Sequence, residues 1–179
     1  RTESPSLESG GITRAGMAIA RACYDTLRKY GKAAIAACEN NVVTPALDAI
    51  IEATVYLSGV GADNVNCAAP HSFYNGVTSL GGHEAYHGNC VAFGTLIQLT
   101  LECADKAEFE DIQNFCLEVG LPITLAELGD FTDEDLHTIA KNACVKGETI
   151  HNLAGDVTPD ELYAAIIATD ALGKARLGK

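Results

Sequence analysis

Residues 158–173 read Thr-Pro-Asp-Glu-Leu-Tyr-Ala-Ala-Ile-Ile-Ala-Thr-Asp-Ala-Leu-Gly, and this stretch shows most clearly which kind of fold the chain adopts. Thr158 and Glu161 have the spacing of a capping box, in which the two residues satisfy each other's free backbone N–H groups at a helix start. Gly173 is a residue type that commonly follows the end of a helix. The stretch therefore predicts a helix that begins after Thr158 and ends near Gly173.

Similar start signals recur along the rest of the chain. Thr44-Pro45 places a capping hydroxyl before a first-turn proline, Asp105 and Thr132 are capping residues, and Thr124 repeats the capping-box spacing. Apolar residues follow at helical spacing, and no segment alternates with the period of two that marks a strand. The expected helices cover about residues 12–30, 46–57, 65–79, 88–103, 105–119, 124–129, 132–144 and 158–173. We therefore expect an all-α fold, one compact helical bundle.

The composition is that of a globular domain, with 47% hydrophobic and 20% charged residues in a chain of 179. The net charge of −12 is spread along the chain and argues against binding to nucleic acid, which requires a basic surface. No apolar run approaches the about 20 residues of a membrane helix, and no signal-peptide pattern is present. We expect a cytoplasmic protein and, since the chain begins at Arg1 and not at Met, a part or a processed form of a longer one.

The seven cysteines are odd in number and widely spaced, and no C-x-x-C motif occurs. Most of them have apolar neighbours in the sequence. This pattern is typical of reduced thiols that are buried in a cytoplasmic protein, and it disfavours a disulfide framework or a cysteine zinc site.

Three of the five histidines, His71, His83 and His87, lie close together in the sequence. Residues 83–87 spell H-E-x-x-H, the zinc-protease motif, which requires one helix to carry both histidines. We disfavour this interpretation because glycines on both sides leave barely one helical turn. In the second interpretation, His71 on a helix and His87 at a glycine-bounded loop end bind one metal and leave a coordination position open. From spacing alone, a purely structural role for His71 stays open.

The other two histidines carry weaker signals. His137 follows three acidic residues on a polar helix face and is expected to be solvated. His151 is expected to be structural. Residues 59–61 read Gly-Val-Gly, but no strand precedes them, so a phosphate-binding loop is not expected there.

Several blocks of sequence resemble the glycerol dehydrogenases, which are metal-dependent polyol dehydrogenases of the iron-containing alcohol dehydrogenase superfamily. The blocks are NVVTPAL at 41–47, YLSGVG at 56–61, HG at 87–88 running into VAFGTL at 91–96, GLPITLA at 120–126 and GETIHN at 147–152. Together they extend the resemblance over about residues 10–172.

The resemblance implies that residues 1–179 form the C-terminal helical domain of a two-domain enzyme. The N-terminal half, which binds NAD in this family, would be absent from the chain, and the active site would lie in the cleft between the halves. The implied reaction is the oxidation of a secondary hydroxyl to a ketone, glycerol to dihydroxyacetone, by metal-assisted hydride transfer to NAD. His71 and His87 match the family's two zinc histidines, whereas its aspartate ligand would lie upstream.

From this resemblance we expect the isolated chain to be inactive, to bind zinc weakly and not to bind NAD. The implied partners are a small polyol, the N-terminal half and, as is usual in the family, further copies of the same protein. No interface signature is present in the sequence, and no nucleic acid or membrane partner is expected.

The sequence also departs from the family pattern at positions expected near the metal site. Relatives usually have an aromatic residue at Ala62, Gly-Gly at Val65-Asn66, Ala at Pro70, His at Tyr74 and Glu at Asn89. Pro70, inside an expected helix, would remove a backbone donor or force a kink. These departures keep a second hypothesis open, in which the chain is a non-catalytic helical module for binding or oligomerisation. Retention of both histidines favours the dehydrogenase.

Overall fold

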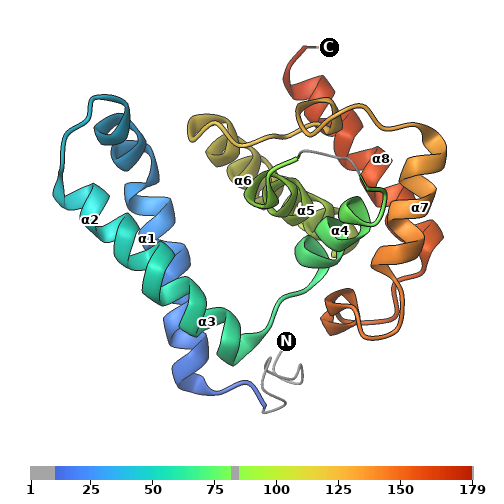
Figure 1. The fold of residues 1–179 in the computed structure, drawn as a ribbon, viewed down its shortest axis with the longest axis horizontal. Coiled ribbons are helices and arrows are strands. Elements are labelled where there is room, and N and C mark those ends of the chain that lie inside the picture. The colour runs from blue at the N-terminus through green and yellow to red at the C-terminus, as the bar shows by residue number, and fades with distance from the viewer. Residues whose placement is uncertain (1–10, 82–84, 179) are drawn as a thin grey trace. The chain divides into compact units, whose positions relative to one another are not determined.

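The computed structural model describes residues 11–81 and 85–178, which form helices and connecting loops (Figure 1). No β-strand occurs among these residues, so the predicted all-α class is confirmed. The sequence predicts one compact bundle; the contacts divide the helices between two compact units, residues 1–66 and residues 67–179. Each unit is described by itself below.

The first unit is a pair of antiparallel helical arms. One arm is α1 (Arg14–Glu39), and the other is a continuous helical run of α2 (Pro45–Glu52), the π-helical turn η1 (Ala53–Leu57) and α3 (Ser58–Val65), which packs along α1 (Figure 1). The buried seam consists of small residues, namely Gly16, Ala34, Ala37, Ala53 and Gly61. Small side chains let the two helix backbones approach closely: a Cβ on Gly61 would lie 3.4 Å from the Cα of Ala20.

Two predicted helix ends in this unit are wrong. α1 continues past Gly31 to Glu39, because the alanines that follow have the highest helix propensity. The second arm does not stop at Ser58-Gly59. Ser58 stays helical because its hydroxyl donates to the carbonyl of Thr54 at 2.7 Å, which satisfies the side chain within the helix.

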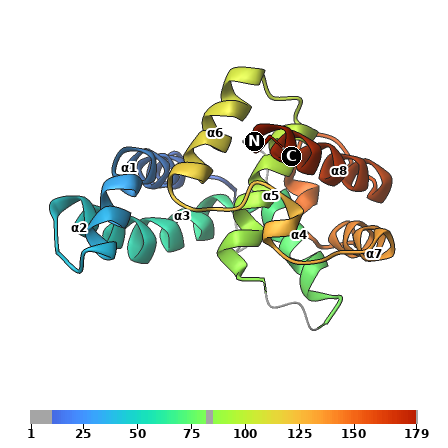
Figure 2. The ribbon, with the colours of Figure 1, turned by 90° about the horizontal axis from the view of Figure 1, so that it is seen from above.

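In its described part, the second unit has a main apolar core and a smaller apolar cluster, around which five α-helices pack. These are α4 (Ala69–Thr78), α5 (His87–Leu101), α6 (Lys106–Glu118), α7 (Asp133–Ala143) and α8 (Pro159–Arg176), with the short 3₁₀ turns η2 (Leu125–Glu127) and η3 (Thr149–Asn152) between them. α4 packs against α5 and α7, and both of these pack against α8 (Figure 2). Phe73 of α4 and Phe93 of α5 are fully buried in the core, with ring centroids 5.8 Å apart.

The helix starts that the sequence predicts from capping residues in this unit are confirmed. Asp105 caps α6 by accepting a hydrogen bond from the backbone N–H of Glu108 at 2.9 Å. Thr124, Thr132 and Thr158 each form a complete capping box at the start of η2, α7 and α8. α8 extends a little beyond the predicted end, to Arg176.

Pro70 does not kink a helix, although a kink was one of the two consequences expected from the sequence. The helix expected over residues 65–79 is interrupted, because α3 ends at Val65 and Asn66 has a φ of 63°. α4 begins afresh at Ala69, which places Pro70 in its first turn. Backbone N–H groups there have no partner within the helix, so proline is well tolerated.

Pro70→Ala is therefore expected to change the free energy of unfolding by less than about 1 kcal/mol. A proline in a helix interior would instead cost about 3 kcal/mol relative to alanine, and its replacement would stabilise the protein by that amount. Urea denaturation followed by circular dichroism distinguishes the two cases. A gain near the larger value would mean that Pro70 strains α4 after all.

The seven cysteines all lie among the described residues and form no disulfide, but their burial differs from the prediction. Cys90 and Cys116 are buried, as expected, but Cys38 and Cys103 are exposed and the other three are partly buried. Burial and the nearby Glu161 raise the pKa of the Cys144 thiol to about 11. Within the described ranges, no helix is both long and apolar enough to cross a membrane.

Candidate metal site

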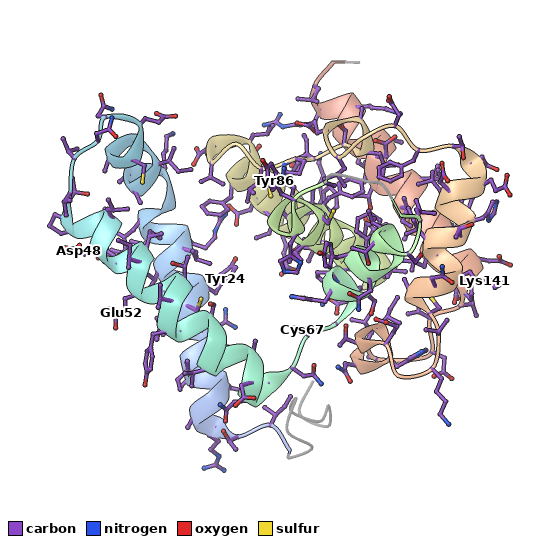
Figure 3. The ribbon with its side chains drawn as sticks, in the orientation of Figure 1. Tyr24, Asp48, Glu52, Cys67, Tyr86 and Lys141 are labelled. Atoms are coloured by element: carbon purple, nitrogen blue, oxygen red, sulfur yellow. The ribbon has the colours of Figure 1, made fainter. Side chains whose placement is uncertain are left out.

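Within the second unit, the fold brings His71 and His87 together. His71 lies in the first turns of α4, and His87 is the first residue of α5. Cys67 and Tyr86, labelled in Figure 3, lie just before these two helices. The imidazole ring centroids are 5.3 Å apart, and the ring planes are inclined at 57°. The two rings are therefore neighbours, although the histidines come from different helices.

The separation of the rings fits two ligands of one zinc ion. Imidazole nitrogens that bind a tetrahedral zinc at about 2.1 Å place their ring centres about 5 Å apart. The observed 5.3 Å between His71 and His87 is close to this value. Among the residues described, no group of three or more His, Cys, Asp or Glu side chains could hold a metal. The pair thus supplies two donors, and metal binding by them stays a prediction.

The surroundings of His71 favour its neutral form. Burial, and secondarily the neighbouring His87, lower the pKa of the His71 imidazole. Only the neutral ring has a lone pair for a metal. The Cys67 sulfur lies 3.8 Å from Nε2 of His71, but burial raises the pKa of this thiol, so it remains protonated and a weak ligand.

Tyr74 limits the orientations of His87. Its ring meets the His87 ring edge-on, with centroids 4.4 Å apart and planes at 84°. This is one of the positions at which the sequence departs from the family pattern. Pro70 and Asn89 also lie on the helices that carry the two histidines, whereas Ala62, Val65 and Asn66 belong to the first unit.

A hydrogen-bonded network joins η3 to the start of α4. The Thr149 hydroxyl donates to the carbonyl of Ala68 at 2.8 Å, and the Asn152 amide donates to the carbonyl of Cys67 at 2.8 Å. The sequence analysis missed this network. Thr149 and Asn152 belong to the block at 147–152, but nothing in a single sequence indicates that this block contacts α4.

The zinc-protease interpretation is not supported by the described part of its motif. α5 begins only at His87, and Ala85 and Tyr86 precede the helix. The motif requires both histidines on one helix, and that condition is not met. His83 and Glu84 lie outside the described residues.

The remaining histidines have roles that agree with the sequence analysis. His137 is exposed on α7, where it stacks on Tyr163 with centroids 4.0 Å apart. Nε2 of His151 lies 3.2 Å from each of the carbonyl oxygens of Cys144 and Val145, at the end of α7. A hydrogen bond from His151 to the carbonyls that follow the end of α7 is a structural role.

Known proteins resemble the chain over nearly its whole length, although no protein-family model matches it. A glycerol dehydrogenase from Pseudomonas putida is 44% identical over 97% of this chain and 48% of its own length. One from Citrobacter freundii is 46% identical over 97% of this chain and 48% of its own length. The crystal structure of glycerol dehydrogenase from Schizosaccharomyces pombe superposes with a TM-score of 0.92 at 36% identity, covering 99% of this chain and 48% of that one.

The chain thus spans about half the length of the relatives that it matches. The part of the chain that is similar in sequence is also similar in fold, since 99% of the chain superposes on the glycerol dehydrogenase structure. By both measures the chain is a homologue of the glycerol dehydrogenases and corresponds to their C-terminal part.

Proposed function

We propose that this chain is the metal-binding helical half of a zinc- and NAD-dependent dehydrogenase that oxidises a secondary hydroxyl of glycerol or a related polyol. The observation that carries the proposal is the pair of imidazoles of His71 and His87, 5.3 Å apart on separate helices. The 44–46% identity to glycerol dehydrogenases supports the choice of reaction. The shift in the pKa of His71 supports binding as a neutral ring.

A divalent metal, when bound, would supply Lewis acidity that makes a substrate hydroxyl more acidic and so prepares it for hydride transfer to NAD. His71 and His87 would hold this metal as neutral donors. Because Tyr74 packs against His87, it would restrict that ring to orientations compatible with His71. Two protein donors leave the remaining positions for a third ligand and for substrate.

The chain covers only about half of its relatives, so the third ligand and the NAD site would lie in the other half. Two neutral imidazoles without an anionic ligand bind zinc weakly. We therefore expect the isolated chain to bind zinc weakly, not to bind NAD, and not to turn over a polyol.

A second candidate function is a non-catalytic helical module for binding or oligomerisation. It is favoured by the absence, among the described residues, of an acidic side chain grouped with the histidine pair. The substitutions at Pro70 and Tyr74 also favour it, because they alter the immediate surroundings of the two histidines.

Zinc titration distinguishes these functions. The wild-type chain is expected to bind one zinc ion through the histidine pair. His71→Ala or His87→Ala is expected to weaken that binding by at least about tenfold, because even the loss of a residue that only orients a metal ligand has an effect of this size. Isothermal titration calorimetry gives the affinity, and ¹⁵N-detected spectra of the imidazoles show which rings respond.

His137→Ala is the matched control, because His137 is an exposed histidine of the same unit that lies on a different helix. It should leave the affinity unchanged. Equal zinc binding by the wild type and His71→Ala would remove His71 from the site and leave the helical module as the better proposal.

A further inference from the structure

We propose that Thr149 and Asn152 are positioning residues, which hold the start of α4 so that His71 meets the metal in the correct orientation. The inference rests on the proposed function in one respect, namely that His71 is a metal ligand. It adds residues that lie far from His71 in the sequence and that do not themselves contact the metal.

The start of α4 has little support of its own. Its N-cap residue, Ala68, has no side chain that could cap the helix. The hydrogen bond that begins the helix, from the N–H of Ser72 to the carbonyl of Ala68, is long at 3.5 Å. His71 lies within this weakly held first turn, so its position depends on other contacts.

η3 supplies these contacts before His71. The carbonyls of Cys67 and Ala68 accept hydrogen bonds from Asn152 and Thr149, both at 2.8 Å. The two bonds fix the backbone of residues 67 and 68, where the chain enters α4.

η3 also supplies contacts directly after His71. The hydroxyl of Ser72 accepts a hydrogen bond from the N–H of Ile150 at 2.7 Å and lies 3.0 Å from the hydroxyl of Thr149. Thr149 has a single hydroxyl proton, which it donates to a carbonyl oxygen that can only accept. Ser72 must therefore donate to Thr149, so both hydroxyl protons of the network have a defined partner.

Burial protects the inner part of this network. Ser72 and Ile150 are fully buried, so water cannot replace the bond between them, whereas Thr149 and Asn152 are partly exposed. Removal of one partner would leave a buried polar group unsatisfied, which is more costly than the loss of the bond itself. Since the network holds the backbone on both sides of His71, it limits the approach of the His71 ring to His87.

The test compares Thr149→Val with Thr149→Ser, which keeps the hydroxyl. In the full chain, Thr149→Val is expected to lower the zinc affinity by about tenfold, the size typical of residues that orient a ligand. Thr149→Ser is expected to restore the affinity to within about twofold of the wild type. Imidazole spectra should show the His71 signals shifted in Thr149→Val and native in Thr149→Ser.

Thr169→Val is the matched control. Thr169 is fully buried in the same unit, and its hydroxyl lies 2.8 Å from that of Thr100. Its replacement by valine also removes one hydroxyl that bonds within the unit, so denaturation should show a loss of stability at least as large, but the zinc affinity should stay native. If Thr149→Val does not fold, Asn152→Ala tests the same network through its bond to Cys67, and a weakened zinc affinity is expected there as well.

The possible failures can be told apart. Native zinc affinity in Thr149→Val, together with loss of binding in His71→Ala, would overturn the positioning role and leave the metal site intact. An equal loss in Thr169→Val would show that stability and not positioning controls the affinity, which also overturns the inference. If the wild type binds no better than His71→Ala, both the metal site and this inference fail.

Discussion

Gly94→Ala is expected to lower the free energy of unfolding by about 2 kcal/mol or more and to move His71 away from His87. A Cβ on Gly94 would lie 2.7 Å from the Cα of Pro70 and 3.1 Å from its carbonyl oxygen. Both are backbone atoms, so no side chain can rotate to make room. α4 would have to shift as a whole relative to α5, and Pro70 directly precedes His71.

Gly88→Ala is the matched control on the same helix. No atom lies within 4 Å of a Cβ at Gly88, so alanine there is expected to be neutral or to stabilise the protein by up to about 1 kcal/mol through its higher helix propensity. Denaturant unfolding gives both free energies, and imidazole spectra report on the histidine pair. Comparable stabilities for the two variants would contradict the close approach of α4 and α5.

The sequence predicts the helix starts of the second unit well because capping signals are local. A threonine and an acidic residue three positions later satisfy the free backbone groups of one turn, whatever the rest of the chain does. Thr132 and Thr158 therefore begin helices where the sequence predicts them.

Helix ends in the first unit could not be predicted in this way. Gly31, Ser58 and Gly59 resemble helix-ending residues, yet the helices continue through them. Gly59 is not part of the buried seam between the arms, since nothing lies within 4 Å of a Cβ built there. A single glycine costs a helix only about 1 kcal/mol relative to alanine, so favourable neighbours can outweigh it and it does not by itself mark a helix end.

The site formed by the histidine pair could be predicted only in part from the sequence. Spacing and resemblance single out His71 and His87, but their separation depends on how α4 packs against α5, through Gly94 and the buried contact of Phe73 with Phe93. The hydrogen bond between Ser72 and Thr149 could not be predicted from the sequence at all. These residues are 77 positions apart, and no local pattern relates them.

The largest effect is expected on catalysis. The measurement uses a longer polypeptide, in which this chain is joined to the second half that its relatives contain. In it, His71→Ala and His87→Ala are each expected to lower kcat/KM for polyol oxidation by roughly a thousandfold. A metal contributes several kcal/mol to such a reaction, and about 4 kcal/mol corresponds to that factor. Either change would leave a single imidazole where the structure offers two.

His151→Ala is the informative control for this measurement, because His151 lies in one of the blocks shared with the dehydrogenases but bonds to carbonyls at the end of α7. Its loss should reduce stability slightly and leave kcat/KM within about threefold of the wild type, as expected for a residue outside the reacting centre. Added zinc should not rescue His71→Ala, whereas a metal-depleted wild type should recover fully. If His71→Ala keeps a tenth or more of the wild-type kcat/KM, binding of the metal cannot depend on the His71 ring. The contact between His71 and His87 would then serve only the packing of α4 on α5.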